Sequence, residues 1–281
     1  MKSRVSRATI AVAAAIALVA LAAPVHAEWN KGLEAYKNKD WATAVTEFEE
    51  VTKTNPDYAG AYYMLGVSQR ALGRVSPAIS SLRKAVELDG SQASYKIALA
   101  QALLQADQYQ SAFEVLKPIN ISSIDASLRS SYALLFAQAA TKTNRPGEAV
   151  NVLTTQVRAD SKNSRLQKAL GVAYSDLGDD AKAFAAFKAA FDLNPRDTDS
   201  GKQAVAKGIV TARRTSSAQQ KNSLYVQSAQ IAERLVAASS TFEHNLLAGE
   251  AWLGAKDYAK AQSWFDKART KQPNNALVYF Y

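Results

Sequence analysis

One pattern of small and large apolar residues recurs along this chain at intervals of 34 residues. It is marked by a small residue with a large apolar residue four positions later, in the pairs Ala44–Phe48, Ala78–Leu82, Ala112–Leu116, Ala149–Leu153, Ala183–Phe187 and Ala261–Phe265. A second set of small residues comes twelve positions earlier, at Gly32, Gly66, Ala100, Ala137, Gly171 and Gly249. A period of this length is typical of a stacked array of two-helix units.

The spacing has a packing explanation. The small residues are expected where the two helices of a unit approach most closely, because a larger side chain there would force the pair apart. The large residue four positions later is expected to fill the space toward the next unit. Pro56, Pro195 and Pro273 stand where each second helix should end.

The repeat resembles the tetratricopeptide repeat, whose signature is W-x2-L-G-x2-Y, then A-x3-F, then P. Three stretches match it in one register: Tyr62 to Gly66 with Ala78, Leu170 to Tyr174 with Ala183, Phe187 and Pro195, and Gly249 to Trp252 with Ala261, Phe265 and Pro273. The resemblance implies an all-α fold, a right-handed α-solenoid of about seven helix-turn-helix repeats, and the N-terminal residues described below place a signal peptide before them.

Seven repeats are expected, at about residues 28–58, 59–92, 93–129, 130–163, 164–197, 198–241 and 242–275. Pro118 is expected to end the second helix of repeat three early, before a loop at 120–123. Repeat six is irregular, with helices expected at about 200–213 and 223–238 and a polar loop at 215–220. Residues 276–281 are apolar and read as the start of an incomplete eighth helix or as a docking tail.

The N-terminus has the three parts of a secretory signal peptide. Lys2, Arg4 and Arg7 form a basic region, and the run 8–21 is apolar and uncharged. Small residues then precede a cleavage site expected after Ala27. The apolar run is 14 residues long, shorter than the roughly 20 that a membrane-spanning helix needs. The sequence therefore predicts a signal peptide at 1–27 and a periplasmic or secreted protein without a membrane span after cleavage.

Composition argues against catalysis and against nucleic-acid binding. The chain has no cysteine, which excludes a lipoprotein anchor, a disulfide and a thiol nucleophile. Cleavage would lower the net charge from +9 to about +6, with 31 cations against 25 acids, which is too modest and dispersed for a nucleic-acid site. No phosphate-binding loop or metal-ligand spacing occurs, and we expect His244 to be a surface or packing residue. We expect no enzyme activity, metal or cofactor.

In the tetratricopeptide family the first helix of each repeat lines a concave groove. The resemblance implies that the groove-lining residues here are Tyr63, Val67, Arg70, Ile97, Gln101, Leu104, Leu134, Gln138, Thr141, Lys168, Val172 and Ser175. Alternatively, some of them pack against a neighbouring first helix. Such a mixed groove suits an extended peptide or a partner helix.

The sequence thus favours an exported scaffold that binds a protein or peptide of the cell envelope and serves envelope assembly. One alternative is that the chain is the truncated solenoid portion of a larger secretion or export protein or enzyme. A weaker alternative is glycan binding, for which Tyr63 is the only aromatic residue among the predicted groove positions. The sequence favours no particular oligomeric state.

Overall fold

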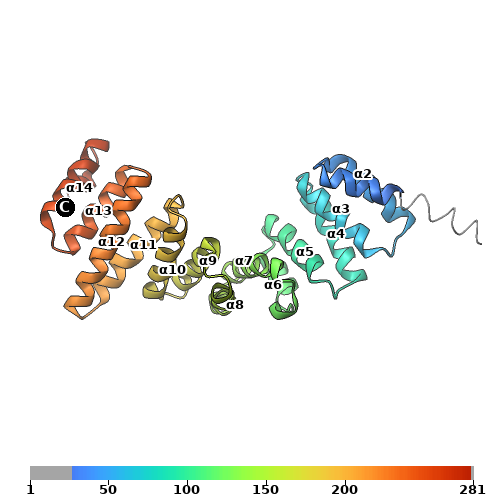
Figure 1. Ribbon diagram of the computed structural model, residues 1–281, viewed down its shortest axis with the longest axis horizontal. Helices are drawn as coiled ribbons and strands as arrows, with labels where there is room; N and C mark the ends of the chain where they lie inside the picture. The colour runs from blue at the N-terminus through green and yellow to red at the C-terminus, as the bar shows by residue number, and fades with distance from the viewer. Residues whose placement is uncertain (1–26, 280–281) are drawn as a thin grey trace, which may run out of the picture. The chain divides into compact units, whose positions relative to one another are not determined.

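The computed structural model describes residues 27–279, and within that range it contains helices and no strand (Figure 1). The expected signal peptide lies outside the described residues except for Ala27, which belongs to the helix described over residues 27–37. The helices that follow are α2 (Trp41–Thr54), α3 (Ala59–Ala71), α4 (Val75–Leu88), α5 (Ala93–Gln105), α6 (Tyr109–Leu116), α7 (Ala126–Lys142), α8 (Pro146–Ala159), α9 (Ser164–Asp176), α10 (Asp180–Leu193), α11 (Thr198–Arg214), α12 (Ala218–Ala238), α13 (Phe242–Gly254) and α14 (Tyr258–Lys271). Two short 3₁₀ helices, η1 (Ile121–Ser123) and η2 (Ala276–Tyr279), complete the described elements.

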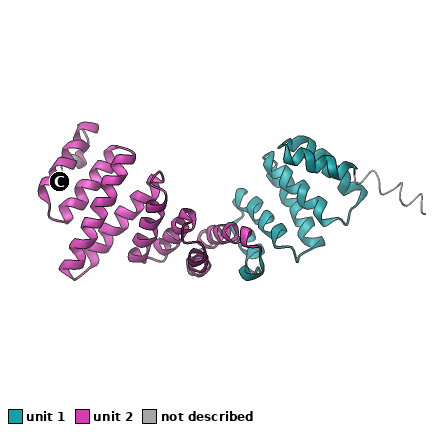
Figure 2. Cartoon of the chain, viewed as in Figure 1, with its two compact units in different colours: residues 1–124 teal, residues 125–281 magenta. Residues whose placement is uncertain are grey.

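These elements form two compact units, the first ending at Ile124 and the second beginning at Asp125 (Figure 2). Within each unit, every helix packs against the next one along the chain. The expected fold class, an all-α repeat solenoid built of helix pairs, is confirmed. None of the helices within residues 27–279 combines the length and apolarity that crossing a membrane requires.

The turn between the two helices of a pair has a recurring backbone conformation. A residue with positive φ occupies it at Lys39, Gly73, Asp107, Asn144, Gly178 and Lys256. This left-handed conformation ends a helix and redirects the chain, and it costs least at glycine. Asp40, Asp179 and Asp257 then cap the second helix, each accepting a hydrogen bond from the backbone N–H three residues later.

The predicted close approach between paired helices is present. The six small residues that begin the pattern are at most 1% exposed: Ala44, Ala78, Ala112, Ala149, Ala183 and Ala261. The glycines twelve positions earlier face the large apolar residue of the partner helix. A Cβ added at Gly66 would lie 2.5 Å from Leu82, and one added at Gly171 would lie 2.8 Å from Phe187. Both distances are shorter than real Cβ contacts, so a larger residue at either position would force the facing side chain to shift.

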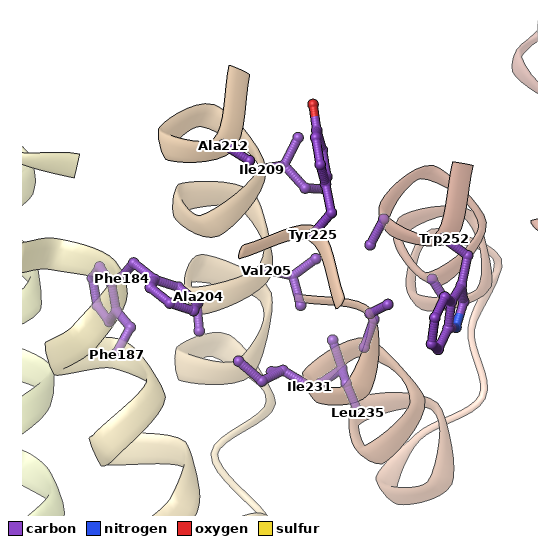
Figure 3. Packing of buried hydrophobic residues seen from close by; sticks show 14 of the residues in the cluster. Phe184, Phe187, Ala204, Val205, Ile209, Ala212, Tyr225, Ile231, Leu235 and Trp252 are labelled. Atoms are coloured by element: carbon purple, nitrogen blue, oxygen red, sulfur yellow. The ribbon is translucent and has the colours of Figure 1, made fainter. Parts of the chain in front are cut away.

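A continuous core joins α10 through α14 in unit 2. Its labelled members come from four helices, and Ile209 of α11 lies beside Tyr225 of α12 (Figure 3). Phe191 and Leu235 belong to the same cluster and are fully buried. Burying a side chain of this size contributes about 1.5–3 kcal/mol, so this cluster holds the irregular sixth repeat firmly between its neighbours.

Several expected boundaries need correction. The first helix of repeat four begins at Ala126 and not near residue 130. In repeat six, α11 and α12 extend further than expected and leave only residues 215–217 between them, so the predicted loop at 215–220 is wrong in its second half. The Ser217 hydroxyl accepts the Gln220 N–H and starts α12 early.

Two other irregular segments can be compared with the sequence. The early end of the second helix of repeat three is confirmed, because α6 stops at Leu116 just before Pro118. At the other end of the chain, residues 276–279 form a turn of 3₁₀ helix, in which Leu277 and Tyr279 are 50% and 69% exposed. The remaining residues of the expected tail, 280–281, lie outside the described part.

Candidate functional site

The twelve predicted groove residues lie on four helices, two in each compact unit. Those of unit 1 lie on α3 and α5, and those of unit 2 lie on α7 and α9. Each set therefore has a geometry of its own.

Helix α5 of unit 1 contributes little open surface. Apart from half-buried Gln101, every residue from Ile97 to Leu104 is buried. Ile97 and Leu104 are only 4% and 7% exposed. These two predicted groove residues belong to the core, because α5 packs against α3, α4 and α6 and its apolar residues cover more than one face. They are not available to a partner in this conformation.

Helix α3 presents a half-buried aromatic patch. Tyr63 stacks on Tyr95 with ring centroids 4.8 Å apart and 27° between the planes. Burial raises the pKa of the Tyr63 phenol, and Tyr36 and Tyr95 beside it act in the same direction. Val67 is half-buried, and the Nε of Arg70 is buried without a hydrogen-bond partner among the described residues.

Sequence reasoning missed two tyrosines of this patch. Tyr36 lies 34 residues before Arg70, so the same register would have identified it. Tyr95 occupies a different position in its repeat, and only the stacking contact with Tyr63 shows its place.

Unit 2 has an open hollow between α7 and α9 with a volume of about 460 Å³. It is lined by Leu134, Ala137, Gln138, Thr141, Lys142, Arg165, Lys168, Ala169 and Val172. Five of the six groove residues predicted on these two helices are in this lining. The 34-residue register places the predicted residues of each helix on one face of that helix, because residues three, four and seven positions apart share a face.

Two further hollows adjoin the first. One is lined by Thr141, Lys142, Asn144, Pro146, Val172 and Asp176, and the other by Val172, Ser175, Phe187, Asp199, Gln203 and Lys207. Val172 lines all three hollows and is 39% exposed. Together they form a groove over α7, α9 and α11 that includes the sixth predicted residue, Ser175. The Ser175 hydroxyl oxygen is buried there without a partner among the described residues.

The charges of the groove are partly fixed by ion pairs. The Lys168 ammonium lies 3.1 Å from an Asp197 carboxylate oxygen and 2.8 Å from one of Asp199. Partial burial acts to raise the pKa of Asp197, but hydrogen bonds from Ser200 and Lys168 outweigh it and hold the pKa below its usual value. Lys207 pairs with Asp180 at 2.8 Å. These pairs connect α9 and α10 to α11.

Sequence reasoning also missed the cations of this groove. Lys142 and Arg165 are exposed at its edge, outside the family positions that identified the other residues. Their proximity depends on how α7 packs against α9, which no single helix pattern reveals.

The arrangement supports binding and offers no catalytic constellation in the described residues. His244 is 5% exposed, and its Nδ1 lies 2.5 Å from the Ser239 carbonyl oxygen, which makes it a packing residue. Within residues 27–279, no group of three or more histidine or carboxylate side chains is placed to hold a metal ion.

Comparison with known proteins identifies the repeat. The family model described as "Tetratricopeptide repeat" matches residues 30–93 and 134–198. A relative from Xenopus laevis, tetratricopeptide repeat protein 37, is 28% identical over 158 residues. Those residues are 56% of this chain but only 10% of the relative, so the chain spans a small part of that protein's length.

Solved structures share the fold at low sequence identity. The C-terminal part of a repeat-containing protein from Cytophaga hutchinsonii is 14% identical, with a TM-score of 0.66 over 89% of this chain and 98% of that chain. A tetratricopeptide repeat protein from Parabacteroides merdae is 13% identical, with a TM-score of 0.58 over 92% of this chain and 96% of its own. The MamA protein is 20% identical, with a TM-score of 0.55 over 63% of this chain and 94% of its own.

Four observations lead to one assignment: the 34-residue register, the glycines where paired helices cross, the recurrent turn and the family match. This chain is a tetratricopeptide repeat protein.

Proposed function

We propose that this protein is a periplasmic scaffold that binds a peptide segment or helix of an envelope partner in the groove of unit 2. The observation that carries the proposal is the hollow between α7 and α9, which gathers Leu134, Gln138, Thr141, Lys168 and Val172 in one lining. Catalysis forms no part of the proposed function.

The groove has the chemistry that recognition of a chain segment requires. Val172 and Leu134 offer apolar surface that a partner side chain can cover, and about 25 cal/mol is gained per Å² of apolar area removed from water. The exposed Gln138 amide and the unpartnered Ser175 hydroxyl can bind backbone groups of an extended segment. Unit 1 adds the Tyr63 and Tyr95 stack as a second candidate surface.

The periplasmic part of the proposal rests on the N-terminal sequence. The basic, apolar and small-residue segments of 1–27 are those of a cleaved signal peptide. We expect the mature protein to begin at Glu28 and to be released from cells by osmotic shock. N-terminal sequencing and fractionation check this, and a protein that retains residues 1–27 in the membrane fraction would contradict it.

The binding function is tested by capturing envelope proteins on mature wild-type protein and on two variants. Val172→Glu places a charge in all three hollows and should remove the partner, because an apolar contact would have to desolvate a carboxylate. Leu193→Glu is the matched control, since Leu193 is 41% exposed on α10 and lines none of the three hollows.

We expect wild type and Leu193→Glu to retain the same partners and Val172→Glu to lose them at unchanged helicity. Equal capture by all three proteins would exclude this groove as the binding site. Leu104→Glu is unsuitable as a test, because Leu104 is buried and its replacement would disturb folding.

A further inference from the structure

We propose that the hollow lined by α9, α10 and α11 is a subsite for a carboxamide side chain, asparagine or glutamine, of the segment bound in the groove of unit 2. This inference rests on the proposed function and adds one element of sequence selectivity to it. Three features of the hollow carry it: charges that cancel, a buried hydroxyl without a partner, and an exposed amide.

The hollow has the size of a side-chain subsite. Its volume is about 240 Å³, roughly half that of the hollow between α7 and α9. Val172 and Ser175 line it from α9. Asp199, Gln203 and Lys207 line it from α11, where a spacing of four residues places all three on one face of the helix. The lining therefore presents polar groups from two helices to one entering side chain.

The charges around the hollow cancel. Asp199 lies 2.8 Å from Lys168, and Lys207 lies 2.8 Å from Asp180. Each pair has one further ion partner, so three cations balance three carboxylates: Lys168, Lys207 and Arg214 against Asp180, Asp197 and Asp199. An ionised side chain entering the hollow would lose hydration without meeting an uncompensated opposite charge. A neutral occupant is favoured.

The Ser175 hydroxyl calls for a polar occupant. Its oxygen is buried and has no hydrogen-bond partner among the described residues. Such a group destabilises a folded protein, and bonding it to a ligand removes that cost. A side chain that enters the hollow reaches this oxygen more readily than the backbone of a segment lying across α9.

Gln203 supplies the second polar group. It is exposed on α11 and makes no hydrogen bond to the described residues. Its amide both donates and accepts hydrogen bonds, as the Ser175 hydroxyl does. A carboxamide is the neutral side chain that both donates and accepts through separate atoms, so it can bond both groups. An apolar occupant would cover the Gln203 amide and replace none of its hydrogen bonds to water.

Val172 fixes the position of the carboxamide within the segment. It lines this hollow and also the one between α7 and α9, so an apolar partner residue that covers Val172 lies beside both. Ser175 is about 4.5 Å further along α9. In an extended segment, residues i and i+2 share one face and are about 6.6 Å apart. A carboxamide two positions from the apolar residue therefore reaches the hollow.

The test uses three blocked fluorescent peptides that differ at two positions. The first has the sequence Ser-Gln-Ala-Leu-Ala-Gln-Ser, which offers a carboxamide in either direction of binding. The others carry Met or Glu in place of both Gln residues, because Met has a similar length without an amide and Glu has the same shape with a charge. Binding to the full mature chain is followed by fluorescence anisotropy.

We expect the Gln peptide to bind about tenfold tighter than the Met and Glu peptides, since only its amide satisfies the polar groups of the hollow. The preference over Met should not change with salt, because neither side chain is charged. A Met or Glu peptide that binds as tightly as the Gln peptide would overturn the proposal.

Two substitutions locate the effect. Gln203→Leu should remove the preference for Gln over Met. Gln230→Leu is the matched control, because Gln230 is exposed on α12 and lines none of the three hollows. Ser175→Ala should weaken the same preference and leave the free protein at least as stable in thermal unfolding, because it deletes an unpartnered hydroxyl. A Gln preference that survives both Gln203→Leu and Ser175→Ala would place the selecting site elsewhere.

Val172→Glu separates this inference from the proposed function. If all three peptides bind equally and all are lost in Val172→Glu, the groove binds segments through apolar and backbone contacts and the carboxamide subsite is wrong. If none of the peptides binds the folded wild-type protein, the subsite is wrong as well, and the capture experiment decides the function separately.

Discussion

Single glycines set the distance between paired helices in this protein. A Cβ added at Gly249 of α13 would lie 2.4 Å from the Phe265 ring of α14, and one added at Gly32 would lie 2.7 Å from Phe48. The large ring and the missing side chain are thus two halves of one contact. The family register follows from this contact, because moving either residue by one position would turn it away from the other.

Replacing Gly249 with alanine should lower the free energy of unfolding by about 1–3 kcal/mol, because the buried Phe265 ring must shift. Gly147→Ala is the control, since an added Cβ there meets nothing within 4 Å. In the first turn of α8 it should be neutral or stabilising by up to about 1 kcal/mol. Chemical denaturation compares the two variants. Equal midpoints would show that the α13–α14 crossing tolerates a larger residue.

At the scale of the elements, repeat six is longer than the others and is nevertheless well held. Its two helices are joined by residues 215–217 only. Arg214 pairs with Asp180 of α10 at 2.5 Å, and Arg213 pairs with Glu250 of α13 at 2.6 Å. These two arginines at the end of α11 therefore connect it to both neighbouring repeats.

The contact between α9 and α11 should make stability depend on pH. Asp197 caps α11, accepts hydrogen bonds from Ser200 and Lys168, and has a pKa below its usual value in the folded protein. A lowered folded pKa contributes stability that is present above the unfolded pKa, about 3.9, and lost as pH falls through the folded value.

Asp197→Asn keeps a capping oxygen but removes the charge. We expect it to lower the free energy of unfolding by about 1 kcal/mol at neutral pH, a figure already reduced for solvent screening. The difference from wild type should shrink as pH falls below about 4. Unfolding curves between neutral pH and pH 3 measure this. A difference that stays constant with pH would show that the charge of Asp197 is not involved.

At the scale of the whole molecule, the chain is divided at the end of repeat three. Pro118 limits α6 to eight residues, and one turn of 3₁₀ helix at Ile121–Ser123 leads to the second unit. Lys117, Pro118, Asn120 and most residues from 122 to 127 are exposed. This segment has fewer helical hydrogen bonds and less burial than the helix pairs on either side.

Limited digestion with subtilisin should therefore cleave first between residues 117 and 127 and leave two helical fragments, because proteases cut where the backbone opens locally. The segment 213–223 should resist longer, since it consists mostly of α11 and α12 and is held by the ion pairs of Arg213 and Arg214. Mass spectrometry of the early fragments identifies the first site. A first cut within 213–223 would reverse this order.

The sequence by itself determined the repeat. The repeat is a local pattern with a fixed period. Each contact between a glycine and the large side chain that faces it lies within a single helix pair, as at Gly66, Gly171 and Gly249. The effect of Pro118 was equally predictable, because a proline beyond the first turn removes a helical hydrogen bond and clashes with the preceding turn. The same register grouped five residues of unit 2 that line one hollow, and their role in binding stays a prediction.

Only the tertiary structure decided which of those positions are open. Leu104 and Val172 were both predicted to line the groove, yet Leu104 is 7% exposed and Val172 is 39% exposed. The difference arises from how the neighbouring helices pack around α5 and around α9, which the residue pattern of a single helix does not reveal. The same holds for the cations beside the groove and for the ion pairs of repeat six, because the pairing of a charge depends on distances between helices and not on the pattern within one.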